Sequence, residues 1–173
     1  MALYLIANGP MPTTAAQAVV TTGTAIKTLL QAKLGGSTNM TGRVVEWGIS
    51  FDGSAAATPI KCELLTTGSV GATITEFVAA DIINLTDPNA GAVTDDFPLA
   101  FTSSGDESGY TATAEGTITA TRMFDVQLVA PTNQYVKQFP LGREPTFKAS
   151  EFLRIRVTAG AAVNAYCYIV FEV

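Results

Sequence analysis

The strongest constraint on the fold is a period-two pattern in residues 43–65, RVVEWGISFDGSAAATPIKCELL. One set of alternate residues is wholly apolar: Val45, Trp47, Ile49 and Phe51. The residues between them are mostly polar or small. This alternation predicts a half-buried β-strand whose inner face carries the only tryptophan of the chain. Asp52-Gly53 then predicts a turn, and residues 60–65 predict a second strand.

The composition favours an all-β domain. Hydrophobic residues make up 47% of the chain and charged residues only 14%, which is a globular composition, and many residues are β-branched. Residues 25–34 fit both helical and strand spacing, and the surrounding threonines favour a strand. The C-terminal run 166–171 is apolar on both faces, as expected of a central strand or of a strand that a partner covers. We therefore expect one jelly-roll-like β-sandwich of about eight antiparallel strands.

Two segments stand apart from this pattern. Residues 1–12 hold the short apolar run Leu3, Tyr4, Leu5 and Ile6, which ends at Asn8-Gly9-Pro10. This run predicts either an extended N-terminal arm that joins a neighbour's sheet or an edge strand of the chain's own sheet. Residues 13–173 are expected to form the sandwich, with a long irregular loop at 86–110. The alternation of Phe97, Leu99 and Phe101 in that loop predicts a contact between subunits.

The charge of the chain limits its partners. The net charge is −5 and no basic cluster is present, which argues against nucleic-acid binding. No run approaches the roughly 20 apolar residues that span a bilayer, so we expect no membrane association. Five arginines are predicted either to form salt bridges between subunits with the acidic loop or to be solvated: Arg43, Arg122, Arg143, Arg154 and Arg156. Cys62 and Cys167 are predicted to be buried free thiols, although a disulfide between them stays open.

The sequence contains little catalytic chemistry. It has no histidine, which removes Ser-His-Asp catalysis and histidine-bound zinc, and it has no phosphate-binding loop or dinucleotide fingerprint. Paired carboxylates of a glycosidase are the remaining catalytic candidates: Asp52, Glu63, Asp95, Asp96, Asp106 and Glu107. A second set offers oxygen ligands to calcium without the spacing of an EF-hand: Asp87, Asn89, Asp95 and Asp96. Surface carboxylates usually serve solubility, so we expect no enzyme activity and no cofactor.

Three stretches together resemble small structural proteins of tailed bacteriophages. They are MALYLIANGPMPTTAAQAVVTTGTAIKTLLQ, RVVEWGISFDGSAAATPIKCELL, and VAPTNQYVKQFPLGREPTF with FLRIRVTAGAAVNAYCYIVFEV. The resemblance covers nearly the whole chain and transfers no site residue. It implies a virion protein, made in the host cytoplasm, that decorates and cements the capsid surface as a homotrimer bound to the major capsid protein. Two alternatives stay open: a tail or head–tail structural protein, and a carbohydrate-binding sandwich that uses Trp47, Tyr110 or Tyr135.

Overall fold

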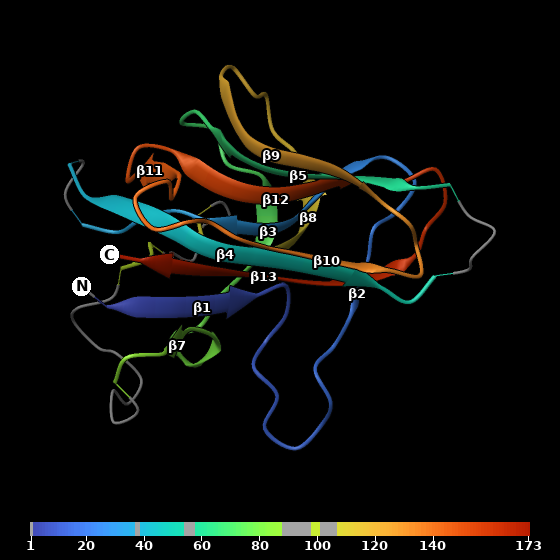
Figure 1. Cartoon of the computed structure of the whole chain (residues 1–173), viewed down its shortest axis with the longest axis horizontal. Helices are drawn as coiled ribbons and strands as arrows, with labels where there is room; N and C mark the ends of the chain where they lie inside the picture. Colours follow the sequence, from blue (N-terminus) through green and yellow to red (C-terminus); the bar gives the residue numbers. More distant parts are fainter. Residues whose placement is uncertain (1, 37–38, 54–57, 88–97, 101–106) are drawn as a thin grey trace.

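The computed structural model describes residues 2–36, 39–53, 58–87, 98–100 and 107–173. Within these ranges the chain forms thirteen β-strands and one turn of 3-10 helix, η1 (Ala79–Asp81). The strands make two antiparallel sheets that pack against each other as a β-sandwich (Figure 1). The expected all-β fold is therefore confirmed. Three of the thirteen strands are only two or three residues long, which is too short for an alternating pattern to reveal.

The first sheet holds the predicted central strand. Its order is β10 (Gln134–Gln138), β4 (Thr41–Phe51), β13 (Asn164–Glu172), β1 (Leu3–Ala7) and β7 (Ile83–Asn84). Two further strands pair with this row: β11 (Thr146–Lys148) with β4, and β2 (Val20–Thr21) with β13. As expected from its two apolar faces, β13 is an inner strand that lies between β4 and β1.

The second sheet has a different strand order. It runs β6 (Thr73–Glu76), β8 (Gly109–Ala114), β3 (Ile26–Ala32), β12 (Phe152–Thr158), β5 (Ile60–Thr67) and β9 (Thr121–Val129). Residues 26–32, which fitted both a helix and a strand, are thus a strand, as predicted. The connections β5–β6 and β8–β9 each join strands that are separated by three others, so both must cross the sheet.

The segment Leu3–Ala7 is a strand of the first sheet and not an extended arm. Strand β1 pairs with β13 along its whole length, from Leu3 opposite Glu172 to Ala7 opposite Tyr168. On its other side β1 pairs with the two-residue strand β7. The strand alternative of the sequence interpretation is the one that the structure adopts, within the chain's own sheet.

The core lies between the two sheets and contains the inner face of β4. Trp47 has no exposed surface, and Ile49 and Phe51 are also buried. The inward assignment of Val45 is wrong, because Val44 is the fully buried residue and Val45 is only half-buried. The register between β4 and β13 shifts at Val170 and Phe171, so a bulge exchanges the faces of the strand at this point.

Candidate interaction surface

The last strands of the two sheets both carry exposed apolar side chains. Strand β9 ends the second sheet and, among the described residues, pairs only with β5, while β10 ends the row of the first sheet. A short turn at residues 130–133 joins the two strands. Five large apolar side chains are exposed along β9, β10 and the following turn: Met123, Val126, Leu128, Val136 and Leu141. We call this set the open edge.

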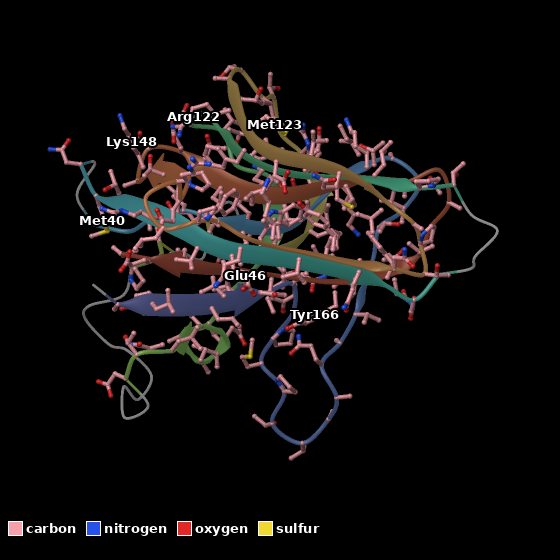
Figure 2. The ribbon with its side chains drawn as sticks, in the orientation of Figure 1. Met40, Glu46, Arg122, Met123, Lys148 and Tyr166 are labelled. Carbon is pink, nitrogen blue, oxygen red and sulfur yellow. The ribbon has the colours of Figure 1, made fainter. Side chains whose placement is uncertain are left out.

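The exposure at the open edge is large for apolar side chains. Leu128 is 73% exposed and Leu141 is 96% exposed. Val126 and Leu128 lie opposite Glu63 and Lys61 of β5, on the outer face of the sheet. Figure 2 shows Met123 and Arg122 on the same strand. Unpaired strand edges with exposed apolar side chains are sites of association with another protein.

The inner side of this edge is held by one buried carboxylate. Asp125 of β9 accepts hydrogen bonds from Trp47 Nε1 at 3.2 Å and from Tyr135 Oη at 2.9 Å. Lys137 Nζ lies 3.1 Å from the other oxygen of Asp125, which also accepts from Gln127. Because Trp47, Tyr135 and Lys137 belong to the first sheet, this cluster ties the two sheets together.

The electrostatics of the cluster keep Asp125 ionised. Burial raises the pKa of the Asp125 carboxyl, but the hydrogen bonds from Gln127, Tyr135 and Lys137, with the charge of Lys137, bring it below its ordinary value. The same arrangement raises the pKa of Tyr135 to about 12, first through burial and then through its hydrogen bond to Asp125. The ionised Asp125 and its hydrogen-bond partners therefore hold β9 in place on the inner side of the open edge.

A second tie connects β9 with the first sheet. Arg122 donates to the backbone oxygen of Thr146 on β11 at 2.8 Å, and its guanidinium lies 5.0 Å from the ring centre of Phe124. Glu151 lies 3.7 Å from the same guanidinium. Side chains thus attach both halves of β9 to the opposite sheet, and the apolar side chains of the open edge are left on the outside.

The structure places the predicted interface residues in different environments. Tyr4 and Ile6 belong to the core, whereas Leu3 and Leu5 are half-buried. Arg43 is exposed on β4. Leu99 is buried and forms an isolated bridge with Leu34. Phe97 and Phe101 lie outside the described residues.

The structure does not support the predicted salt bridge between Arg154 and another subunit. Its side chain has no exposed surface, so it contacts no other subunit in this fold. Its guanidinium donates to the backbone oxygens of Val70 at 2.6 Å and Glu115 at 3.2 Å. These two acceptors lie in the β5–β6 and β8–β9 connections. Arg154 therefore holds both crossing connections on the outer face of β12.

The two crossing connections also contact each other. Gly68 N donates to the oxygen of Ala120 at 3.1 Å, and a Cβ on Gly116 would lie 2.6 Å from the oxygen of Gly71. Arg156, the other predicted bridge on β12, pairs within the chain with Glu63 at 3.0 Å. The charged residues of β12 thus stabilise the fold of the single chain.

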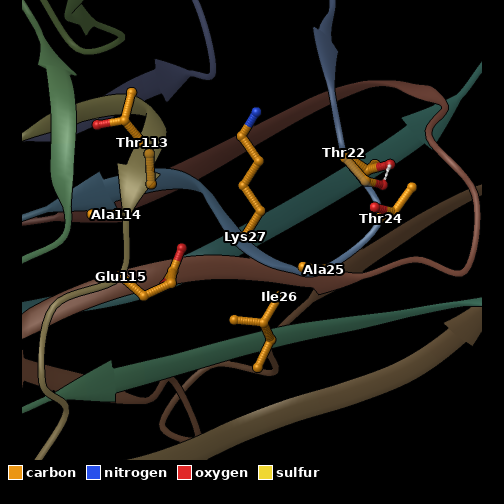
Figure 3. A pocket seen from close by; sticks show the side chains of 10 residues that line it. Thr22, Thr24, Ala25, Ile26, Lys27, Thr113, Ala114 and Glu115 are labelled. Atoms are coloured by element: carbon orange, nitrogen blue, oxygen red, sulfur yellow. Dashed lines mark hydrogen bonds between the residues drawn. The ribbon is translucent and has the colours of Figure 1, made fainter.

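A shallow hollow of about 300 Å³ lies between the β2–β3 turn and the end of β8. Figure 3 shows Lys27 and Glu115 at its sides. Lys27 Nζ donates to the oxygen of Thr21 at 2.9 Å, and burial lowers the pKa of this amine while Glu115 opposes the shift. Glu115 accepts from the backbone and the hydroxyl of Thr28. Both charged groups of the hollow are therefore engaged by the chain itself.

The aromatic and acidic candidates from the sequence have mostly structural contacts. Trp47 is buried and Tyr135 is bonded to Asp125, while Tyr110 packs against Phe77 with 5.6 Å between ring centres. Glu63 pairs with Lys61 and Arg156, and Glu107 pairs with Lys33. Asp52 is exposed and accepts from Asn164. Asn89, Asp95, Asp96 and Asp106 lie outside the described residues.

Both cysteines are free and buried, as predicted. Burial raises the pKa of Cys62 to about 12, with a further contribution from Glu63. Burial also raises the pKa of Cys167, and Cys62 adds to this shift. In the described ranges, three or more acidic, cysteine or histidine side chains are nowhere grouped as ligands for a metal. Those ranges also hold no helix with the length and apolarity of a membrane span.

Sequence reasoning missed the open edge as a surface. The period-two rule assigns the apolar residues of a strand to the core. In residues 124–128 the alternate set Phe124, Val126 and Leu128 is apolar while Asp125 and Gln127 are polar, so the rule assigns to the core the side chains of Val126 and Leu128 that the structure exposes. No family model matches the chain, and neither a curated protein nor a solved structure matches it significantly.

Proposed function

We propose that this chain is a non-enzymatic structural subunit of a tailed-bacteriophage virion. In this role it binds the outer surface of the capsid lattice, contacts the major capsid protein and stabilises the shell as a decoration protein. The observation that carries the proposal is the open edge, where exposed apolar side chains line the terminal strands of both sheets. The resemblance of three sequence stretches to phage structural proteins supports the same class.

The open edge has properties that suit permanent association. Its apolar side chains release water when a partner covers them, which stabilises a complex by roughly 25 cal/mol per Å² before association costs. The Asp125 cluster and Arg122 hold β9 in place before binding. A rigid surface loses little conformational freedom on binding, and this favours a tight complex.

Self-association as a homotrimer belongs to the same proposal. A trimer closes through three equivalent head-to-tail contacts, each between two different surfaces of neighbouring subunits, which leaves the open edge for the lattice. Analytical ultracentrifugation distinguishes the mass of three chains from that of one. A sharp species at three chain masses is the expected result, and a single-chain mass at all concentrations contradicts the trimer.

Binding of the chain to the capsid lattice is tested by co-sedimentation of the purified chain with particles that were assembled without this chain. The wild-type chain should sediment with the particles, and Leu128→Asp with Val126→Asp should weaken binding by about tenfold or more. Leu85→Asp is the matched control, because Leu85 is an exposed apolar residue that follows β7 at the far edge of the first sheet. Absence of wild-type binding contradicts the proposed function.

A further inference from the structure

The outer face of the first sheet carries a pair of tyrosines. Tyr166 and Tyr168 alternate along β13 with Cys167 and Ile169, which are buried in the core, so both tyrosines lie on the face that points away from it. Their ring centres are 6.4 Å apart, with 35° between the ring planes, and both residues are half-buried. Figure 2 shows Tyr166 and Glu46 on this sheet. The two rings together form an aromatic surface on the outside of the sandwich.

The second ring of the pair is held in place by strand β4. Tyr168 Oη donates a hydrogen bond to Glu46 Oε1 at 2.5 Å. The ring lies across Gly48, where a Cβ would come within 2.5 Å of Tyr168 Cε1 and 2.9 Å of Cζ, so a larger residue there would push the ring away. Within the described part of the chain, the hydroxyl of Tyr166 makes no hydrogen bond. Tyr166 therefore lies beside a fixed ring and keeps its own hydroxyl available.

A hollow of about 370 Å³ lies at the end of β4, in the same row of side chains as Tyr166. It is lined by Ser50, Phe51, Thr132, Asn133 and Gln134. Ser50 lies opposite Tyr166 of β13 and, on its other side, opposite Gln134 of β10. Residues directly opposite each other on antiparallel strands have their side chains on the same face of the sheet. The row from Tyr166 through Ser50 to Gln134 therefore connects the aromatic surface with the hollow.

The polar groups of this hollow are all neutral. The hydroxyls of Ser50 and Thr132 and the amides of Asn133 and Gln134 each offer both donors and acceptors of hydrogen bonds. The hollow beside β3, in contrast, is lined by a lysine and a glutamate that the chain itself engages. Neutral groups that donate and accept are suited to a ligand whose own groups do both, and hydroxyl groups have this property.

We infer that Tyr166 and the adjoining hollow form a binding site for a neutral carbohydrate. The C–H groups of a sugar ring pack on the face of Tyr166, because the face of an aromatic ring carries partial negative charge. The hydroxyls of the sugar then exchange hydrogen bonds with Ser50, Asn133 and Gln134. The site shares no residue with the open edge and uses none of the three aromatic residues that the sequence offered for carbohydrate binding. It is therefore a function in addition to the proposed one.

The test uses the purified chain and an array of defined bacterial oligosaccharides, both neutral and acidic, followed by calorimetric titration with the glycan that binds most tightly. We expect binding to neutral members of the array. Tyr166→Ala should raise the dissociation constant by about tenfold or more, and Gln134→Ala by about fivefold. Gln138→Ala is the matched control, because Gln138 is exposed on the same strand but lies outside the hollow. This variant should bind within about twofold of wild type, since it removes no contact with the sugar.

Different outcomes contradict different parts of the inference. If no glycan on the array binds, the inference fails, while the proposed function stands or falls by co-sedimentation with particles. If acidic glycans bind in preference to neutral ones, the ligand class is wrong. If Tyr166→Ala and Gln134→Ala both bind as tightly as wild type, the sugar lies elsewhere. Gln134→Ala alters only an exposed side chain, so it tests the site even if Tyr166→Ala does not fold; circular dichroism and Trp47 fluorescence compare each variant with wild type.

Discussion

Trp47 Nε1 donates a hydrogen bond to Asp125 Oδ2 across the sandwich, with 3.2 Å between the two atoms. Trp47 lies on β4 of one sheet and Asp125 lies on β9 of the other. The only tryptophan of the chain is therefore an internal reporter of whether the two sheets are joined at the open edge. Tryptophan fluorescence can therefore measure whether the hydrogen bond between Trp47 and Asp125 is intact.

Asp125→Asn should destabilise the fold and change the tryptophan signal. The substitution removes the charge that pairs with Lys137, whose side chain is 35% exposed and partly solvated. We expect a loss of about 1 to 3 kcal/mol in the free energy of unfolding, and an altered emission maximum of Trp47. Chemical denaturation followed by fluorescence measures both. Asp52→Asn, at an exposed carboxylate, is the control, and equal stability of the two variants would contradict the role of Asp125.

The contribution of Asp125 should disappear in acid. Because its pKa is lower in the folded chain than in the unfolded chain, its stabilisation is present at neutral pH. It is lost as the pH falls below the unfolded value of about 3.9 towards the folded value. The difference in unfolding free energy between wild type and Asp125→Asn should therefore shrink between about pH 6 and about pH 3. A difference that is independent of pH would show that the charge of Asp125 contributes nothing.

Arg154→Met should be more damaging than any exposed arginine substitution. It removes the donor that holds the oxygens of Val70 and Glu115 and leaves these groups without their buried partner. We expect a loss of about 3 kcal/mol or more in the free energy of unfolding. Arg43→Met, at an exposed position of β4, should change stability by less than about 0.5 kcal/mol. Thermal unfolding of both variants tests the assignment, which fails if their midpoints coincide.

The two thiols should resist modification while the chain is folded. Burial holds the pKa values of Cys62 and Cys167 above their ordinary range, so little reactive thiolate forms near neutral pH. Titration with a thiol reagent should detect almost no reaction in buffer and two thiols per chain in denaturing guanidinium chloride. Rapid reaction of either cysteine in the native state would contradict its burial.

The sequence predicts the parts of the fold that follow a two-residue repeat. It identifies the β4 segment and the inner position of β13 from the apolar pattern, and the buried free cysteines from that pattern together with the expected synthesis in the cytoplasm. It misses the bulge near Val45, because a bulge depends on the register of the neighbouring strand. It also misassigns Arg154, because the two connections that bury this residue are distant in sequence and short in regular structure. The sequence does not reveal the open edge either, because exposure depends on which strand ends a sheet.

The connection between β1 and β2 is a second place where the sequence predicts the end of a strand but not the tertiary contacts. The sequence marks Asn8-Gly9-Pro10 as the end of a strand, and this agrees with the last residue of β1 at Ala7. Nothing in the spacing indicates that Asn8 would bond to β13, which lies more than 150 residues away along the chain. Local patterns therefore locate the ends of elements, whereas the anchors of a loop depend on tertiary contacts.

The most direct test of the central claim is a density map of an intact phage particle that carries this chain. The account predicts that the sandwich lies on the outer surface of the capsid shell, with the open edge of β9 and β10 covered by a neighbouring protein. Density for the chain in the tail, or an open edge that faces solvent in every copy, would contradict the account.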